Sequence, residues 1–122
     1  MSEEIWRPIP GYHYYEASTE GRIRSLDADV VLYDKYKKPY SKHYFGRVLR
    51  QTEDKRYGYT YVTLATGLAA SKRVGVHTLV ALAFVPNPYN YRYIQHIDGD
   101  KANNRPTNLV WVLSGKSHHN FS

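Results

Sequence analysis

The chain contains no cysteine among its 122 residues. This absence excludes a disulfide framework and any zinc site with cysteine ligands, and it fits a reducing compartment. No apolar run approaches the roughly 20 residues that a membrane-spanning helix needs. The start of the chain, MSEEIWRPIP, is acidic and contains proline, which is unlike a secretory signal. We therefore expect a soluble protein of the cytoplasm that makes no membrane contact.

Acidic residues are also few. Eleven Asp and Glu stand against seventeen Lys and Arg, which gives a formal net charge of +6. This balance favours a polyanionic partner such as duplex DNA. Apolar residues make up 42% of the chain, which is enough for a modest core and too much for a disordered chain. The length indicates one compact domain, or a small domain with an appended module.

Tyrosine, in contrast, is abundant, with thirteen residues. Most of them suit half-buried strands. From Tyr33 to Tyr44, however, tyrosines are interleaved with basic residues, a pattern typical of a surface that contacts a sugar-phosphate backbone. Residues 27–47 show no clean periodicity, so we expect a long exposed loop or an irregular excursion there. The predicted DNA contacts of this loop are Lys35, Lys37, Lys38 and Lys42.

The N-terminal part of the chain predicts a small β-hairpin. Residues 12–17 can form a strand, and a tight turn follows in which Gly21 supplies a positive φ. Residues 22–26 alternate between polar and apolar, as a half-buried strand does. Arg22 and Arg24 then share one face of the hairpin. They are interpreted either as a solvated strand face or as contacts to DNA phosphates.

The middle of the chain predicts two strands and a helix. Residues 59–64 are rich in aromatic and β-branched side chains, and residues 73–76 can pair back against them. Residues 76–85 carry apolar side chains at helical spacing, and Pro86 ends that helix. His77 at its start is interpreted as structural rather than catalytic. Polar or small-residue turns are expected at residues 52–57 and 66–72.

Residues 93–112 predict a second hairpin that presents a histidine. Phosphodiester hydrolysis needs a base for water, a cation for the charge on phosphate, and a group that orients the base. His96 is suited to be the base, because imidazole titrates near working pH. Asn108 lies where the second arm begins, so its side-chain carbonyl is expected to reach the His96 ring. Oxygens for a hard cation are available nearby from Asp98, Asp100, Asn103 and Asn104, although Asp98 and Asp100 are alternatively turn and cap residues.

These residues carry a family resemblance. HIDGDKANN followed by PTNLVWV resembles the core of HNH homing endonucleases of the phage and intron type. IWRPIPGYHYYEASTEGRIRSL is similar to the nuclease-associated modular motif that precedes such cores, and GYTYVTLA and VHTLVALAFVPNP resemble the linking strand and helix. The resemblance implies an α+β fold with a small N-terminal antiparallel β-sheet plus helix, followed by a ββα-metal finger. It divides the chain into a β-rich DNA-contacting module, residues 1–72, and an HNH nuclease unit, residues 73–122.

The resemblance also implies roles. His96 becomes the general base and Asn108 the residue that orients it. The family usually has Asp or Asn as a metal ligand just before the base, where this chain has Gln95. The final ligand falls on Ser117, or on His118 or Asn120 if the register slips. The implied cofactor is a divalent metal ion, Mg²⁺ or Mn²⁺.

The implied activity is metal-dependent nicking or cleavage of duplex DNA, in the host cytoplasm if the protein is phage-encoded. A homodimer or a protein partner would add sequence specificity. Because both metal-ligand positions depart from the family pattern, the alternative is a weakened or inactive DNA-binding or interaction protein on the same fold. The predicted DNA contacts are Arg22, Arg24, the four lysines named above, Lys101 and Arg105.

Overall fold

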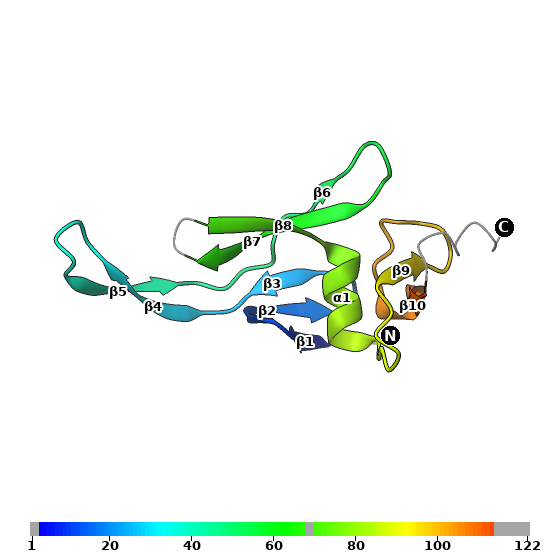
Figure 1. Ribbon diagram of the computed structural model, residues 1–122, viewed down its shortest axis with the longest axis horizontal. Coiled ribbons are helices and arrows are strands. Elements are labelled where there is room, and N and C mark those ends of the chain that lie inside the picture. Colours follow the sequence, from blue (N-terminus) through cyan, green and yellow to red (C-terminus); the bar gives the residue numbers. More distant parts are fainter. Residues whose placement is uncertain (1–2, 68–69, 114–122) are drawn as a thin grey trace.

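The computed structural model describes residues 3–67 and 70–113. One helix, α1 (Val76–Phe84), lies at the centre and contacts strands of both three-stranded sheets as well as the hairpin near the C-terminal end. Figure 1 shows these strands arranged around it. This arrangement confirms the predicted α+β class.

Helix α1 forms where the sequence predicted it. Val76, Leu79, Val80 and Ala81 are fully buried, so the apolar stripe of the helix faces the core. The helix ends at Phe84, two residues before Pro86, because proline disfavours helical geometry in the residue that precedes it. Among the described residues, no helix is long and apolar enough to cross a membrane.

The first antiparallel sheet consists of β1 (Trp6–Ile9), β2 (Tyr12–Ser18) and β3 (Ile23–Ser25). The β2–β3 hairpin confirms the predicted one. In its turn, the Ser18 hydroxyl accepts hydrogen bonds from the backbone N–H groups of Glu20 and Arg22, and Gly21 has φ +78°. Strand β1 was not predicted, because prolines interrupt its sequence. It lies at the sheet edge, where proline is tolerated.

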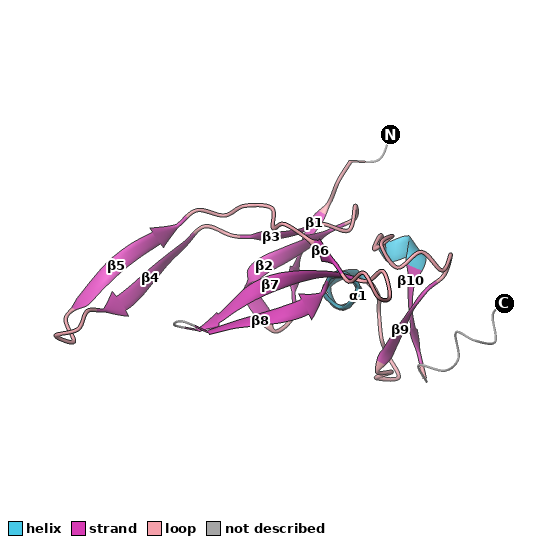
Figure 2. Cartoon of the chain, turned by 90° about the horizontal axis from the view of Figure 1, so that it is seen from above, coloured by secondary structure: helices cyan, strands magenta, loops and turns pink. Residues whose placement is uncertain are grey.

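The predicted long loop at residues 27–47 is wrong. Strands β4 (Ala28–Tyr33) and β5 (Pro39–Tyr44) pair along their whole length. Half-buried and exposed residues do alternate along β4, but β5 is exposed throughout and carries no periodic pattern. The Asp34 carboxylate stabilises the turn by accepting hydrogen bonds from the backbone N–H groups of Tyr36 and Lys38. This hairpin, hereafter the arm, projects away from the rest of the molecule (Figures 1 and 2).

The second sheet consists of β6 (Thr52–Glu53), β7 (Thr60–Gly67) and β8 (Ala70–Gly75), again antiparallel. Strands β7 and β8 confirm the two predicted strands. Both extend into the expected turn at residues 66–72, so that turn is shorter than predicted. The expected turn at residues 52–57 begins with β6, which pairs with the start of β7.

The last hairpin joins β9 (Tyr93–His96) to β10 (Leu109–Val112) through a loop that ends in the 3₁₀ helix η1 (Pro106–Asn108). It confirms the predicted arms and places Leu109 opposite His96. The C-terminal helix of the expected ββα-metal finger lies outside the described residues.

One hydrophobic core joins the first sheet, β7, β8, α1 and the last hairpin, and the arm lies outside it. It contains buried residues from both sides of the predicted boundary at residue 72, so the two expected units pack against each other through α1. Packing of this kind fixes the hairpin β9–β10 relative to both sheets. The buried apolar side chains are Ile9, Ala17, Ile23, Val62, Leu64, Val74, Val76, Leu79, Val80, Ala81 and Leu109.

Candidate active site

His96 stands at the end of β9 and is 7% exposed. Its Nε2 lies 2.7 Å from the side-chain oxygen of Asn104. The amide nitrogen of Asn104 donates to the Thr60 hydroxyl at 2.8 Å, so the amide oxygen faces the ring. Nε2 must therefore carry the proton that it donates to Asn104, which leaves the lone pair on Nδ1.

The other ring nitrogen of His96, Nδ1, has no hydrogen-bond partner among the described residues. Within the described part of the chain, the ring makes one hydrogen bond, the one through Nε2. His96 also lines a surface cavity. A neutral imidazole held through one nitrogen and free at the other is the arrangement that a general base requires.

The predicted contact between Asn108 and the His96 ring is wrong. The Asn108 side-chain oxygen accepts the Asp98 backbone N–H at 3.0 Å, and its amide donates to the Asp98 carboxylate and to the Asn103 carbonyl oxygen, both at 2.9 Å. Asn108 directly precedes Leu109, the residue that pairs with His96. The Asn108 carboxamide forms its hydrogen bonds within the loop and does not reach the ring. The residue that orients His96 is Asn104, and Asn108 stabilises the loop that carries it.

Asp98 is a turn residue, as one of the two interpretations had it. Its carboxylate accepts hydrogen bonds from Asn103, from the backbone N–H of Asp100 and from Asn108. These same bonds lower the pKa of Asp98 below its ordinary value. The Asp100 carboxylate in turn accepts the Ala102 N–H at 3.0 Å. Both carboxylates are therefore engaged in shaping the loop.

The first sheet packs against the site, although its residues are far from His96 in the sequence. A side-chain Cβ at Gly21 would lie 3.1 Å from the backbone carbon and oxygen of Asn104, and the positive φ of Gly21 also disfavours other residues. The turn between β2 and β3 thus packs directly against the residue that orients His96. Gln51 holds the same turn through a hydrogen bond to the Gly21 carbonyl oxygen.

A second histidine packs beside the first. The ring of His77 lies 5.4 Å from that of His96 and 5.2 Å from that of Tyr59, centre to centre. Burial, together with the charge that His96 would carry, lowers the pKa of His77 to about 4. His77 therefore stays neutral at pH 7, and its Nδ1 is buried without a partner among the described residues. It supports the His96 ring by packing, which fits the structural role predicted for it.

The pKa of His96 is also below its ordinary value. Burial is the largest cause, and the positive charge of Lys101 acts in the same direction. The hydrogen bond to Asn104 and the charges of Asp98 and Asp100 oppose the shift without cancelling it. Most His96 side chains are therefore neutral at pH 7, the form that can accept a proton.

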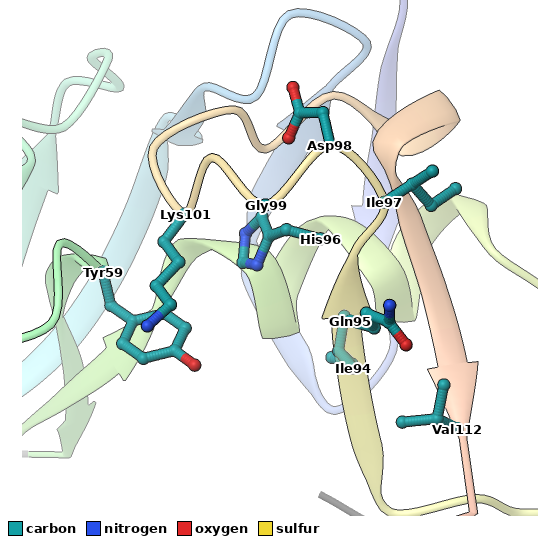
Figure 3. A pocket seen from close by; sticks show the side chains of 9 residues that line it. All are labelled: Tyr59, Ile94, Gln95, His96, Ile97, Asp98, Gly99, Lys101 and Val112. Atoms are coloured by element: carbon teal, nitrogen blue, oxygen red, sulfur yellow. The ribbon is translucent and has the colours of Figure 1, made fainter. Parts of the chain in front are cut away.

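The free side of His96 faces a shallow cavity of about 280 Å³. Figure 3 shows the imidazole on the same side of β9 as Tyr59 and Lys101, with the Gln95 carboxamide on the other side. This placement follows from the alternation of side chains along a strand. The cavity is lined by Tyr59, Ile94, Gln95, His96, Ile97, Asp98, Gly99, Lys101 and Val112.

Gln95 is the described residue whose chemistry fits a metal ligand. Its side-chain oxygen is buried and has no hydrogen-bond donor among the described residues. An oxygen of this kind suits a hard cation, although a carboxamide brings no charge. The described residues contain no group of three His, Asp or Glu arranged around a metal. The other predicted ligands, Ser117, His118 and Asn120, lie outside the described residues.

The basic residues predicted to bind DNA fall into two groups. Arg22 pairs with Glu4, Arg24 with Glu16 at 2.6 Å, and Arg105 with Glu20 at 3.0 Å. A phosphate would have to compete with these carboxylates. Lys101 and the lysines of the arm make no ion pair within the described residues, so their charges are available to a polyanion.

Sequence reasoning named Asn104 only as one of several nearby oxygens and gave no role to Tyr59 or Thr60. Asn103 and Asn104 are identical in type and adjacent, and no spacing rule decides which of them faces the histidine. Thr60 is the first residue of β7 in the second sheet, and Tyr59 immediately precedes it. Their approach to His96 is a product of tertiary packing.

Replacing Asn104 by alanine is expected to destabilise the protein by about 1–3 kcal/mol, because it leaves the His96 Nε2–H and the Thr60 hydroxyl buried without their partner. The neighbouring Asn103→Ala is the matched control, since Asn103 makes an exposed hydrogen bond to Asp98. Chemical denaturation of both variants measures the difference. Equal losses would contradict the assignment of Asn104 as the buried link.

Two family models match the sequence of this chain. The NUMOD4 motif matches residues 4–65, and the HNH endonuclease family matches residues 74–119. The chain belongs to the HNH endonuclease family and carries an N-terminal NUMOD4 motif, as the sequence resemblance indicated.

Individual relatives support this family assignment. The uncharacterized HNH endonuclease L247 of Acanthamoeba polyphaga mimivirus is 31% identical over 118 residues, 93% of this chain and 25% of the relative. DNA endonuclease I-HmuI of Bacillus phage SP01 is 31% identical over 108 residues, 88% of this chain and 51% of the relative. A solved structure described as DNA binding and cleavage by the HNH homing endonuclease I-HmuI matches with a TM-score of 0.64 and 27% identity, over 97% of this chain and 60% of that one. The chain thus spans a quarter to about half of these curated relatives.

Proposed function

We propose that this protein is a DNA endonuclease that hydrolyses phosphodiester bonds of duplex DNA, with His96 as the general base. The observation that carries the proposal is the geometry of that side chain. Nε2 is fixed by Asn104, Nδ1 has no hydrogen-bond partner among the described residues, and His96 lines a cavity together with Lys101. Family membership supports the same reaction class.

In this mechanism, a water molecule lies between Nδ1 of His96 and the phosphorus atom. Nδ1 takes one proton as the water oxygen bonds to phosphorus, and the bond from phosphorus to the leaving deoxyribose oxygen breaks. The departing oxygen gains a proton from solvent, and the imidazolium later returns its proton to solvent. The Asn104 oxygen accepts from Nε2–H throughout, so it also stabilises the imidazolium.

We further propose Mg²⁺ or Mn²⁺ as the cofactor. Gln95 would hold it through its unpartnered side-chain oxygen, together with Ser117 or His118. When bound, such a metal supplies positive charge next to the phosphate and to the leaving oxygen. Gln95 itself contributes a neutral ligand, so affinity for the metal would depend more on the phosphate than it does in a site with a carboxylate.

The shape of the molecule supports duplex DNA as the partner. The arm and the hairpin β9–β10 lie at opposite ends of the long axis in both views (Figures 1 and 2). An extended polyanion can therefore meet the arm lysines at one end and the His96 cavity at the other. On this basis, residues 1–72 would mainly bind DNA and residues 73–122 would cut it, with a homodimer or protein partner adding specificity.

One observation favours a second candidate, a weakened or inactive DNA-binding or interaction protein. Gln95 brings no negative charge to the position where the family usually has a metal ligand. A protein of this kind would keep the arm lysines and the fold but lose hydrolysis.

The test is incubation of the protein with supercoiled plasmid and either Mg²⁺ or Mn²⁺. Conversion to open-circular or linear DNA that stops on chelation of the metal is the expected result. A gel-shift measurement on the same plasmid reports binding separately. Binding without strand cleavage in either metal would reject the nuclease and select the second candidate.

A further inference from the structure

Lys101 is the basic residue of the described chain that lines the same cavity as His96. Its ammonium nitrogen lies 4.8 Å from the centre of the Tyr59 ring, and that ring lies 6.0 Å from the ring of His96. Figure 3 shows the Lys101 side chain extended along Tyr59 on the imidazole side of β9. His96, the proposed general base, and Lys101 therefore line the same cavity.

The loop that carries Lys101 is fixed by its own hydrogen bonds. Asp98 and Asp100 each accept a backbone N–H two residues further along, on either side of Lys101. Gly99, with φ +80°, allows the turn between them. The backbone at Lys101 is therefore held in place, and cation–π contact with Tyr59 directs its side chain.

The charge of Lys101 is also not neutralised by a carboxylate in the described structure. Its ammonium has no carboxylate within ion-pair distance, whereas Arg105 in the same loop is paired with Glu20. The arm lysines are similarly unpaired, but they lie at the other end of the molecule (Figure 1). Lys101 is half-buried beside the proposed general base, and its unneutralised charge would meet an anion there.

We propose that Lys101 is a catalytic residue whose ammonium contacts a non-bridging oxygen of the phosphodiester bond under attack. The inference rests on the proposed nuclease function and gives Lys101 a role distinct from general DNA binding. Negative charge on these oxygens grows as the water oxygen bonds to phosphorus. A cation already in position stabilises that charge without having to reorganise. Because Gln95 adds no charge of its own, this fixed cation matters more in this chain.

The experiment compares Lys101→Met with Lys38→Met, the same substitution on the arm, in plasmid nicking under single turnover at saturating protein. Lys101→Met is expected to lower the saturated rate by about 10²–10³-fold, with DNA affinity changed much less. Lys38→Met is expected to act on affinity instead, because it removes a phosphate contact away from the reaction, and it gives the reference for an effect on binding alone. Lys101→Arg should recover part of the rate.

A second measurement does not depend on turnover. NMR signals of the His96 imidazole and of Tyr59 are followed while a 12-base-pair duplex is added without metal. We expect shifts in the wild type and in Lys38→Met that disappear in Lys101→Met. If the wild type shows these shifts but never nicks, the nuclease proposal fails and Lys101 is reduced to a phosphate-binding residue. If Lys101→Met weakens affinity only, or the shifts persist in it, the catalytic role of Lys101 is overturned.

Discussion

His96→Ala is expected to lower the rate of plasmid nicking by about 10²–10⁴-fold. Among the described residues, the substitution removes the imidazole that lines the cavity, and water alone is a much weaker base. His77 cannot take over. Its Nδ1 is buried, and its pKa of about 4 makes it a poor base. The nicking rate at saturating protein measures the effect.

His13→Ala is the matched control, since His13 is exposed on β2. It should nick at the wild-type rate. Because His96→Ala also leaves Asn104 without its buried partner, thermal unfolding and DNA binding of the variant are measured beside the rate. A folded, DNA-binding His96→Ala variant that still nicks at the wild-type rate would remove His96 from the mechanism.

The second large effect is a loss of stability in acid. His77 has a pKa of about 4 in the folded protein, compared with 6.5 when exposed. The unfolded chain therefore binds more protons as pH falls through this interval, and each added proton favours unfolding. The difference corresponds to about 3 kcal/mol of unfolding free energy, present at pH 7 and lost by the time the pH is below 4. The lowered pKa of His96 acts in the same direction.

Urea unfolding of the wild type and of His77→Leu at pH 7, 5.5 and 4 measures this effect. The stability of His77→Leu should fall less steeply with pH, because leucine binds no proton. His13→Leu, which alters an exposed histidine, should keep the steep dependence of the wild type. If the free energies of unfolding of the wild type and of His77→Leu fell equally with pH, His77 would not be buried in its neutral form.

Much of the fold follows from local signals in the sequence. The helix at α1 is predicted because apolar residues recur at helical spacing and Pro86 follows. The β2–β3 turn is predicted because Gly21 can adopt a positive φ. The arm was not predicted, because an exposed two-stranded ribbon buries little and β5 leaves no alternating pattern in the sequence. Hydrophobic periodicity reports burial, and this hairpin lies outside the core.

The site was predicted in its residue types rather than in its contacts. His96 could be named because a lone imidazole at a strand end, followed by a polar loop, is unusual for a core. The hydrogen-bond partner of His96 could not be identified from the sequence, because Asn103, Asn104 and Asn108 all lie within reach along the chain. The choice of Asn104 depends on Thr60 and Gly21, which approach from two different sheets. Long-range packing of this kind has no local sequence pattern.

The most direct test of the central claim is the tautomer of His96, read from the ¹⁵N chemical shifts of its ring at pH 7, with His96→Ala used to assign the signals. We predict a neutral ring protonated on Nε2 and unprotonated on Nδ1, with a titration midpoint below 6.5. That state leaves the base nitrogen free to accept a proton from water. A ring protonated on Nδ1 at pH 7, alone or together with Nε2, would contradict the account.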